Sequence, residues 1–398
     1  MRWVFVLLIL SFGVVEAKIS PLGRAPDWRG LERYQETITR EEFLRLFDEV
    51  YAPRGAWAEW MRVGEASVKV KTLGGDYELR FARRREEARP VERYWRPRAA
   101  MQAPRANKPM SGVRVAIDPG HIGGKWAKME ERWFQIGNER PVTEGDMTLV
   151  VARRIAARLM ALGAEVVLTR AGARPSTSLR PGDLVGEARA SLRDRKLPVT
   201  AFSLKKESER LFYRVAEIRQ RARFVNERIQ PDLVLCLHFN AEGWGNPERP
   251  ELVEGSHLHF LITGAWSAEE LSYEDQRYEM LDKLLSRAFE EELAVTKAVA
   301  DAMARETGLP PYVYTGNHAV NVGGNPYIYA RNLLANRLFR CPVVYLEPYV
   351  MNSRQDYERI QAGDYRGVRM VGGVLRKSIY REYADGVVAG LVNYYSRR

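Results

Sequence analysis

Two histidines of this 398-residue chain stand where buried strands are expected to end. His121 follows the apolar stretch 113–118, and His238 lies in the apolar stretch 231–240. A carboxylate, Glu144, stands just before a predicted helix. A catalytic zinc ion takes about three nitrogen or oxygen ligands and keeps one position for water. These residue types therefore indicate zinc-assisted hydrolysis as the chemistry to test.

Strands and helices alternate along the chain after residue 112. The apolar and helical patterns predict strands at 113–118, 164–170, 231–240, 256–263 and 341–349, and helices at 146–163 and 219–229. Such alternation is typical of an α/β fold with a mostly parallel twisted sheet and helices on both faces. Ligands of these sheets collect beyond the carboxyl ends of the strands. His121, His238 and Glu347 all fall at such ends, so we expect one site there.

Three further histidines compete for a role. His257 and His259 lie two apart on a predicted strand and so share one face, a spacing that can bind metal. His318 lies in a loop rich in Gly and Asn that could form a groove wall. The alternative for each is an ordinary polar residue of a strand or a surface loop.

Four motifs follow one another from about residue 112 to the C-terminus. They are "IDPGH", "TEGDMTLVVARRIAARLMALGAEVVLTR", "LVLCLHFNA" and "CPVVYLEPYVMN". Their order and spacing resemble those of the zinc-dependent Amidase_3 family of N-acetylmuramoyl-L-alanine amidases. That family has a strand ending in DPGH, a glutamate opening a helix, a strand ending in HxN, and a late strand with a second glutamate.

The resemblance implies a role for each matching residue. Three would be the ligands of one zinc ion: His121, Glu144 and His238. Glu347 would be the catalytic glutamate, taking a proton from water and passing it to the departing nitrogen. Arg221 and Asn226, in "RARFVN", resemble an Arg and an Asn that we expect to be structural. Asp118 could orient His121, and Asn240 of the HxN motif is expected near the substrate.

The sequence also departs from the family pattern. Ile122 separates the histidine from two glycines that directly follow it in the family. The stretch before Glu144 is longer than usual, so Glu139 stays open as the alternative ligand. Glu347 is followed by Pro348, Tyr349 and then Asn352. This asparagine follows the glutamate with one residue fewer than is usual in the family.

The substrate implied by the resemblance is the amide that joins N-acetylmuramic acid to L-alanine in the stem peptides of peptidoglycan. The expected role is cell-wall remodelling or daughter-cell separation. Two other functions stay open: a zinc peptidase acting on wall stem peptides, and a non-catalytic wall-binding regulator on the same scaffold.

The chain divides into several predicted segments. They are a signal peptide at 1–17, a small α+β domain at 28–95, a linker at 96–111, and a catalytic domain at 112–398 with insertions near 171–218 and 264–296. The alternative for the first segment is an uncleaved membrane anchor. The acidic insertion 264–296 could plug the site until a protein activator displaces it, or it could be a simple solvated helix.

Composition suggests an exported protein with an anionic partner. The formal net charge is +11, and export favours an anionic cell-envelope polymer over nucleic acid. We therefore expect a periplasmic or secreted protein without a membrane span after signal cleavage. The only two cysteines, Cys236 and Cys341, lie in apolar stretches, which favours buried free thiols over one disulfide.

Overall fold

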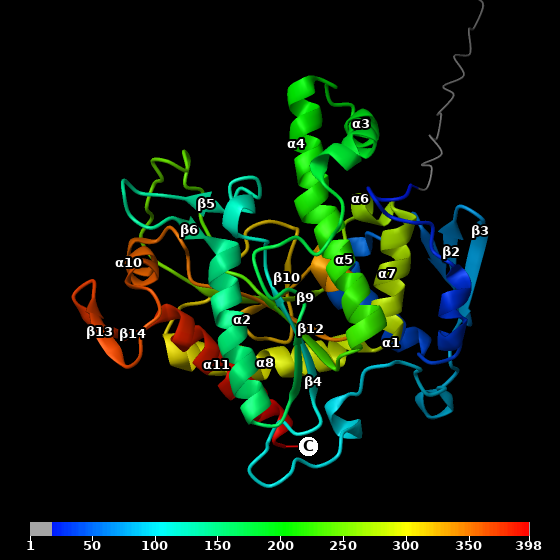
Figure 1. Cartoon of the computed structure of the whole chain (residues 1–398). Coiled ribbons are helices and arrows are strands. Elements are labelled where there is room, and N and C mark those ends of the chain that lie inside the picture. Colours follow the sequence, from blue (N-terminus) through cyan, green and yellow to red (C-terminus); the bar gives the residue numbers. More distant parts are fainter. Residues whose placement is uncertain (1–17, 398) are drawn as a thin grey trace, which may run out of the picture.

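The apolar stretches of the sequence form the centre of a seven-stranded sheet in the computed structural model, which describes residues 18–397 (Figure 1). In spatial order the strands are β10 (Val320–Asn321), β11 (Ile328–Arg331), β9 (Leu258–Thr263), β12 (Val343–Pro348), β8 (Leu233–Leu237), β4 (Arg114–Pro119) and β7 (Glu165–Leu168). The predicted signal peptide at 1–17 lies outside the described residues.

The sheet is mixed. Strands β12, β8, β4 and β7 pair in parallel, and so do β11 and β9. The β12–β9 and β10–β11 pairs are antiparallel. The predicted α/β fold with a mostly parallel sheet is confirmed, while the two antiparallel pairs were not indicated by the sequence.

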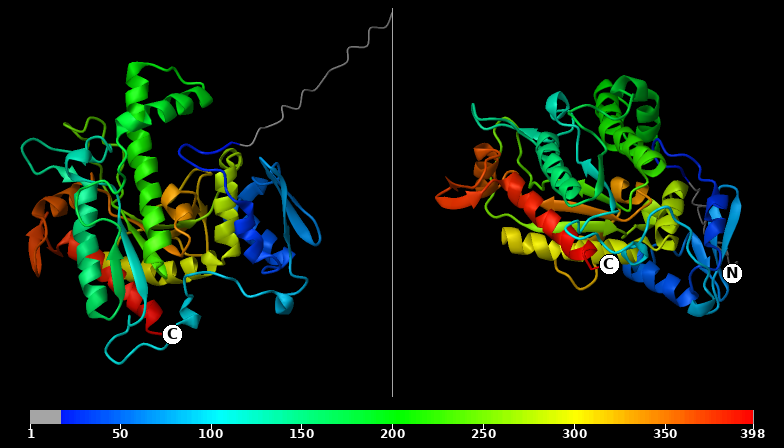
Figure 2. Two further views of the ribbon diagram at one scale, coloured as in Figure 1. Left: turned by 45° about the vertical axis from the view of Figure 1, so that its right-hand side comes forward. Right: turned by 60° about the horizontal axis from the view of Figure 1, so that its bottom comes forward.

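Helices cover both faces of the sheet (Figures 1 and 2). One face packs against three helices: α2 (Glu144–Ala161), α8 (Ala288–Thr307) and α11 (Ile379–Tyr395). The other packs against α5 (Glu217–Phe224) and α9 (Leu334–Leu338). Ile117 and Leu235 belong to the first core, whereas Ala116 and Cys236 belong to the second. Every central strand is therefore apolar on both sides, as expected for a sheet buried on two faces.

Helix α2 begins earlier than its sequence pattern predicts. Its first residue is Glu144 rather than Asp146, and it ends at Ala161, before Gly163, whose φ is +100°. Gly tolerates this left-handed conformation, which stops the helix. Glu144 is consequently held by the first turn of a helix and not by a loop.

The N-terminal segment contains a helix and a three-stranded sheet, as an α+β segment should. Thr39 caps α1 (Arg40–Leu46) by accepting a hydrogen bond from the Glu42 amide, and a hairpin of β2 (Ser67–Thr72) and β3 (Gly75–Arg80) is flanked by β1 (Met61–Val63). The apolar side chains of this segment join the core that lies under the sheet. The segment also binds the rest of the chain through its backbone, because Val50 accepts a hydrogen bond from the Ala265 amide (2.7 Å).

The first insertion is mostly helical. It contains α3 (Val185–Asp194) and α4 (Ala201–Leu211), and α4 continues through a π turn into α5. The predicted helix at 219–229 therefore begins at Ala201. Figure 1 shows α3 and α4 projecting from the body as an arm, so much of their surface is exposed. An exposed helix needs no wide apolar stripe, which explains why its pattern was missed.

The second insertion is packed rather than solvated. It contains α6 (Ala268–Leu271), α7 (Glu274–Leu285) and the start of α8.

Cys236 and Cys341 are both buried free thiols, as expected. The remaining elements are β5 (Trp133–Phe134), β6 (Val142–Thr143), α10 (Arg354–Ala362), β13 (Val368–Val371), β14 (Val374–Lys377) and short 3-10 or π turns. No helix of residues 18–397 is long and apolar enough to cross a membrane.

Candidate functional site

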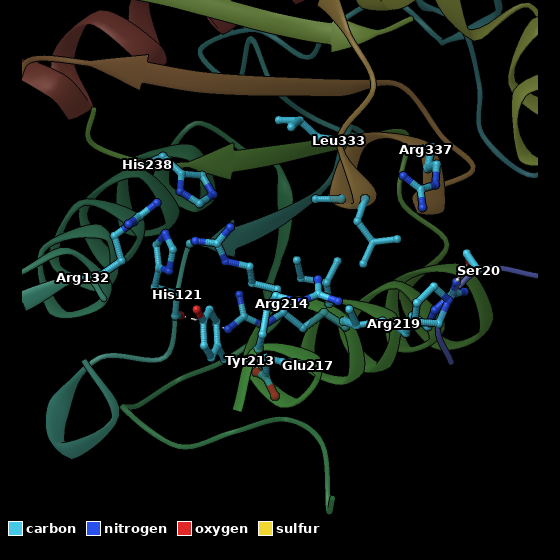
Figure 3. A pocket seen from close by; sticks show the side chains of 18 of the residues that line it. Ser20, His121, Arg132, Tyr213, Arg214, Glu217, Arg219, His238, Leu333 and Arg337 are labelled. Atoms are coloured by element: carbon cyan, nitrogen blue, oxygen red, sulfur yellow. Dashed lines mark hydrogen bonds and ion pairs between the residues drawn. The ribbon is translucent and has the colours of Figure 1, made fainter. Parts of the chain in front are cut away.

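The two strand-end histidines and Glu144 meet at one edge of the sheet. Figure 3 shows the two histidines side by side. Pro119 of β4 pairs with Leu237 of β8, so His121 and His238 leave neighbouring parallel strands at the same level. One ligand atom from each of the three residues lies within 4.8 Å of the other two. Two imidazoles and one carboxylate form the donor set of catalytic zinc sites. Among residues 18–397, this is the group of side chains whose spacing fits a metal ion.

Glu144 is the centre of this group. Its carboxylate lies 2.9 Å from Nδ1 of His238 and 3.2 Å from Nε2 of His121, and it accepts a hydrogen bond from the Phe239 amide. Burial opposes its charge, but the two histidines hold the pKa of Glu144 well below its ordinary value. The alternative carboxylate, Glu139, is exposed and accepts a hydrogen bond from Tyr357, so it is not part of the group.

The two histidines sit in unlike surroundings. Burial lowers the pKa of both, and for His238 this effect prevails. For His121 the carboxylates of Glu144 and Glu130 outweigh burial and raise the pKa to about 9. The His238 ring also stacks on Tyr345, with ring centroids 4.5 Å apart, which fixes its orientation.

Glu347 lines the same cavity as the three clustered residues. It lies on β12, next to β8, and its side chain faces the same sheet surface as Tyr345. Burial and then the nearby Glu144 carboxylate raise the pKa of Glu347 above its ordinary value. The pKa of Glu144 is thus lowered and that of Glu347 raised within one cavity. Such a pair suits different roles, because Glu144 stays anionic while Glu347 can take up and release a proton.

The backbone of the turn after β4 packs directly against the His238 ring. A Cβ added to Gly120 would lie 2.3 Å from the His238 ring, so this close approach requires glycine. His121 itself has φ +58°, a left-handed conformation that is uncommon for residues other than glycine.

Arg221 holds this turn in place. It is buried and donates to the carbonyls of Pro119 (3.0 Å) and His121 (2.9 Å), while it pairs with Asp118 (3.3 Å) and Glu217 (3.0 Å). Asp118 therefore contacts Arg221 and Thr169 rather than the His121 ring. We expected Asp118 to orient His121. The contacts link the two residues through Arg221 and the backbone.

Three further residues of the site were not found from the sequence. Glu130 accepts from the Ile122 amide (2.8 Å) and approaches Nδ1 of His121 to 3.6 Å. Arg132 forms a 3.1 Å ion pair with Glu144. Arg170 donates to the carbonyls of Gly120 and Gly145, and so ties the turn to the start of α2. Only Arg170 carried a signal, because it ends the predicted strand 164–170.

Most other candidates lie outside the group formed by His121, Glu144 and His238. Asn240 lines the cavity, with Oδ1 accepting from the Ala241 amide. His257 lies near Asn240, and His259 lies 3.0 Å from the Tyr314 hydroxyl. His318 is exposed and is not among the residues that line the cavity.

Asn226 has the structural role that we expected. It lies in the π turn that follows α5, where it donates to the Leu338 carbonyl and accepts from the Arg340 amide, so it joins this turn to the segment before β12.

The cavity has a volume of about 1200 Å³ and extends well beyond the cluster of His121, Glu144 and His238. The far part is lined by residues 19–22, by the arm, and by Arg214, Arg219 and Arg337 (Figure 3). From the acidic insertion 264–296 only Tyr273 and Gln276 line it. Glu274 binds Trp28, Asp275 binds Ser20 and Arg219, and Glu279 binds Arg337. These carboxylates have other partners than the clustered histidines.

Known proteins share this sequence pattern. The sequence model of the Amidase_3 family, described as N-acetylmuramoyl-L-alanine amidase, matches residues 115–369. No curated protein sequence matches this chain significantly.

Among solved structures, the chain is similar to the N-acetylmuramyl-L-alanine amidase Ami1 from Mycobacterium smegmatis (16% identity, TM-score 0.39, covering 73% of this chain and 99% of that chain). It is also similar to the CwlD amidase from Clostridioides difficile in complex with the GerS lipoprotein (12%, 0.39, 71% and 98%). A third is the amidase AmiC2 of Nostoc punctiforme (17%, 0.36, 71% and 98%).

Replacing Arg221 by Met should lower the free energy of unfolding by about 3–5 kcal/mol, because two buried carboxylates and two carbonyls lose their partner. Denaturant unfolding measures the change. The matched control is Arg223→Met, an exposed arginine on the same helix, which should change the free energy by no more than about 0.5 kcal/mol. Equal losses in the two variants would contradict the assigned contacts.

Proposed function

We propose, since this chain belongs to the Amidase_3 family of N-acetylmuramoyl-L-alanine amidases, that it is an exported zinc hydrolase. It cleaves the amide between N-acetylmuramic acid and the L-alanine of peptidoglycan stem peptides. The observation that carries this proposal is the convergence of His121, Glu144 and His238 beside Glu347 in one cavity. The proposal of export rests on the predicted signal peptide at 1–17. The role of the protein in wall remodelling or daughter-cell separation stays a prediction.

The donor set supports zinc as the cofactor. His121 and His238 offer two ring nitrogens and Glu144 a carboxylate oxygen, which is the ligand number of a catalytic site with an open position. Zinc held there would supply Lewis acidity, which makes a water molecule more acidic and polarises the amide carbonyl.

Glu347 is the proposed proton carrier. In its ionised form it accepts a proton from the attacking water, whose oxygen forms a bond to the amide carbon. When the carbon–nitrogen bond breaks, Glu347 returns the proton to the nitrogen and frees the amine of L-alanine. The lactyl group is left as a carboxylate. A raised pKa suits this double role, because the carboxyl must both accept and release a proton near neutral pH.

Other residues of this chain prepare the reaction. Tyr345 keeps the His238 ring in its orientation, and Arg221 keeps the turn that presents His121. Stem peptides carry carboxylates, and the exposed guanidinium of Arg214 lines the far part of the cavity. We propose that this part receives the peptide.

Two alternatives differ in their products. A zinc peptidase would generate internal peptide ends, and a non-catalytic regulator would generate none. The regulator is disfavoured because all three candidate ligands and Glu347 are present. Digestion of isolated sacculi with and without chelator, followed by mass spectrometry, should release peptides that begin with free L-alanine only when metal is available.

The activator also stays a prediction. A protein that displaces segment 264–296 would have to break the contacts of α7 with Ser20, Arg219 and Arg337. These contacts lie in the far part of the cavity, so displacement would widen the proposed peptide region.

Replacing Glu347 by Gln should keep zinc and lower kcat about 10²–10⁴-fold, because the amide cannot accept the proton of water. The rate of release of L-alanine amine from sacculi measures this loss. Glu242→Gln is the control, since Glu242 is another carboxylate of the cavity and should leave the rate within a few-fold. Retained activity in Glu347→Gln would remove this residue from the reaction.

Elemental analysis should find one zinc per chain, and chelation should lower Tm by about 5 °C when the metal had been present at a thousandfold excess over its Kd. His238→Ala should lose both the zinc and the chelator effect. His318→Ala is the control and should keep both, because His318 is exposed outside the cavity lining. Zinc retained by His238→Ala would refute the ligand set.

A further inference from the structure

The hairpin formed by β13 and β14 exposes an unusual amount of apolar surface. It is a separate two-stranded sheet that projects beyond α10 and α11 (Figures 1 and 2). Val368, Met370 and Leu375 are 59%, 64% and 64% exposed, and Val374 is 49% exposed. None of them joins a hydrophobic cluster of the described residues. Contiguous exposed apolar side chains mark interaction surfaces.

Cations accompany these apolar side chains. Arg369 of β13 lies directly opposite Arg376 of β14, and like charges in such a pair destabilise a hairpin. Met370 lies opposite Leu375 in the neighbouring pair. One acid, Glu358, lies beside the turn at Gly372. The hairpin therefore combines apolar and cationic side chains.

A basic cavity of about 700 Å³ opens at the base of the hairpin. Its lining includes five cations from α2, β14 and α11: Arg153, Arg154, Arg158, Lys377 and Arg381. Four of them pair with three carboxylates, Asp364, Asp385 and Glu306, whereas Arg153 donates to the Ala171 carbonyl.

The cations of this cavity are crowded. Within residues 18–397, the buried Nε of Arg154 has no hydrogen-bond partner. Arg154 and Arg381 share the single carboxylate of Asp364, so their charges are only partly balanced. An anion bound here would balance the remainder.

We propose that the β13–β14 hairpin docks on a bilayer surface that contains anionic phospholipid. Val368, Met370 and Leu375 enter the interface between headgroups and acyl chains, and the arginines of the basic cavity bind headgroup phosphate. Guanidinium groups suit phosphate because their donors match its oxygens in pairs.

The chemistry of the surface favours lipid over two other occupants. An anionic wall polymer would pair with the cations but would leave the apolar side chains in water. A second copy of the chain in a symmetric contact would cover the apolar side chains but would bring no anion to the cations of the basic cavity. A bilayer with anionic headgroups satisfies both kinds of side chain.

Docking would leave the metal-binding cavity open. The two cavities share no lining residue, because α2 gives Glu144 at its first turn to one and Arg153, Arg154 and Arg158 to the other. The protein would stay at the membrane while its other cavity receives wall strands. This inference goes beyond the proposed hydrolysis, and vesicle binding can be measured whether or not the protein is active.

The test is co-sedimentation of the full mature chain with vesicles of phosphatidylcholine alone or with about 30% phosphatidylglycerol, at low and high salt. Wild type should bind the anionic vesicles at least about tenfold more tightly, and salt should weaken the binding. Met370→Ser with Leu375→Ser should weaken binding about tenfold or more. Arg153→Gln with Arg381→Gln should weaken it about fivefold for each cation removed.

The matched control is Phe202→Ser with Lys205→Gln on the arm. Phe202 is 73% exposed, more than any apolar residue of the hairpin, and Lys205 is exposed. This variant should bind anionic vesicles like wild type, and all variants should hydrolyse a soluble muropeptide like wild type. A loss of binding in the control equal to that of the hairpin variant would overturn the proposal.

Three other results would also overturn it. They are equal binding to both vesicle types, hairpin-dependent retention on lipid-free wall material without vesicle binding, and self-association that the hairpin variant abolishes. The last would be seen by sedimentation velocity.

Discussion

The parallel pairing of β4 with β8 is the constraint on which the site depends. It places His121 and His238 at one level, and the Gly120 amide donates to the Leu237 carbonyl (2.8 Å) just before the histidine. A slip of one residue in this register would turn alternate side chains to the opposite face of the sheet. Because Gly120 lies against the His238 ring, the backbone itself sets the distance between the two histidines. The geometry of the candidate metal site is therefore a property of the sheet and not of flexible loops.

Burial of charge is the second condition that the fold must meet. Isolated carboxylates are costly to bury, so each one needs a partner. Glu144 has two histidines and Arg132, and Asp118 and Glu217 share Arg221. Among residues 18–397, Glu347 has no comparable ion pair, and burial and the nearby Glu144 carboxylate raise its pKa. The same rule that stabilises the cluster thus distinguishes the residue proposed to carry a proton from the residue proposed to hold the metal.

The sequence predicted what depends on strand patterns and missed what depends on tertiary partners. Buried parallel strands are continuous apolar stretches, so the strand-end positions of His121, His238 and Glu347 could be anticipated. Nothing in the sequence distinguishes Glu130, which contacts the amide after His121, from its exposed neighbour Glu131. The arm and the β13–β14 hairpin have little apolar periodicity facing a core. The sequence therefore predicted an insertion near 171–218 but not its helices, and it did not predict the hairpin. The sequence left Glu139 and Glu144 as alternative candidate ligands. Only the structure shows that Glu144, in the first turn of α2, lies beside the two histidines.

Helix α2 contributes residues to the candidate site, to the core and to the basic cavity. The charges at its two ends agree with the direction of the helix dipole. Glu144 occupies the first turn, where the partial positive charge of the helix favours an ionised carboxylate. Arg158 occupies the last turn, where the partial negative charge favours a cation. Between them, Ile155 and its neighbours on one face are buried under the sheet, while Arg153 and Arg154 line the basic cavity. With 3.6 residues per turn, one helix can present a carboxylate to the two strand-end histidines, apolar side chains to the core and arginines to a second surface. Changes to the exposed arginines should therefore leave the position of Glu144 unchanged, because the buried face holds the helix in place.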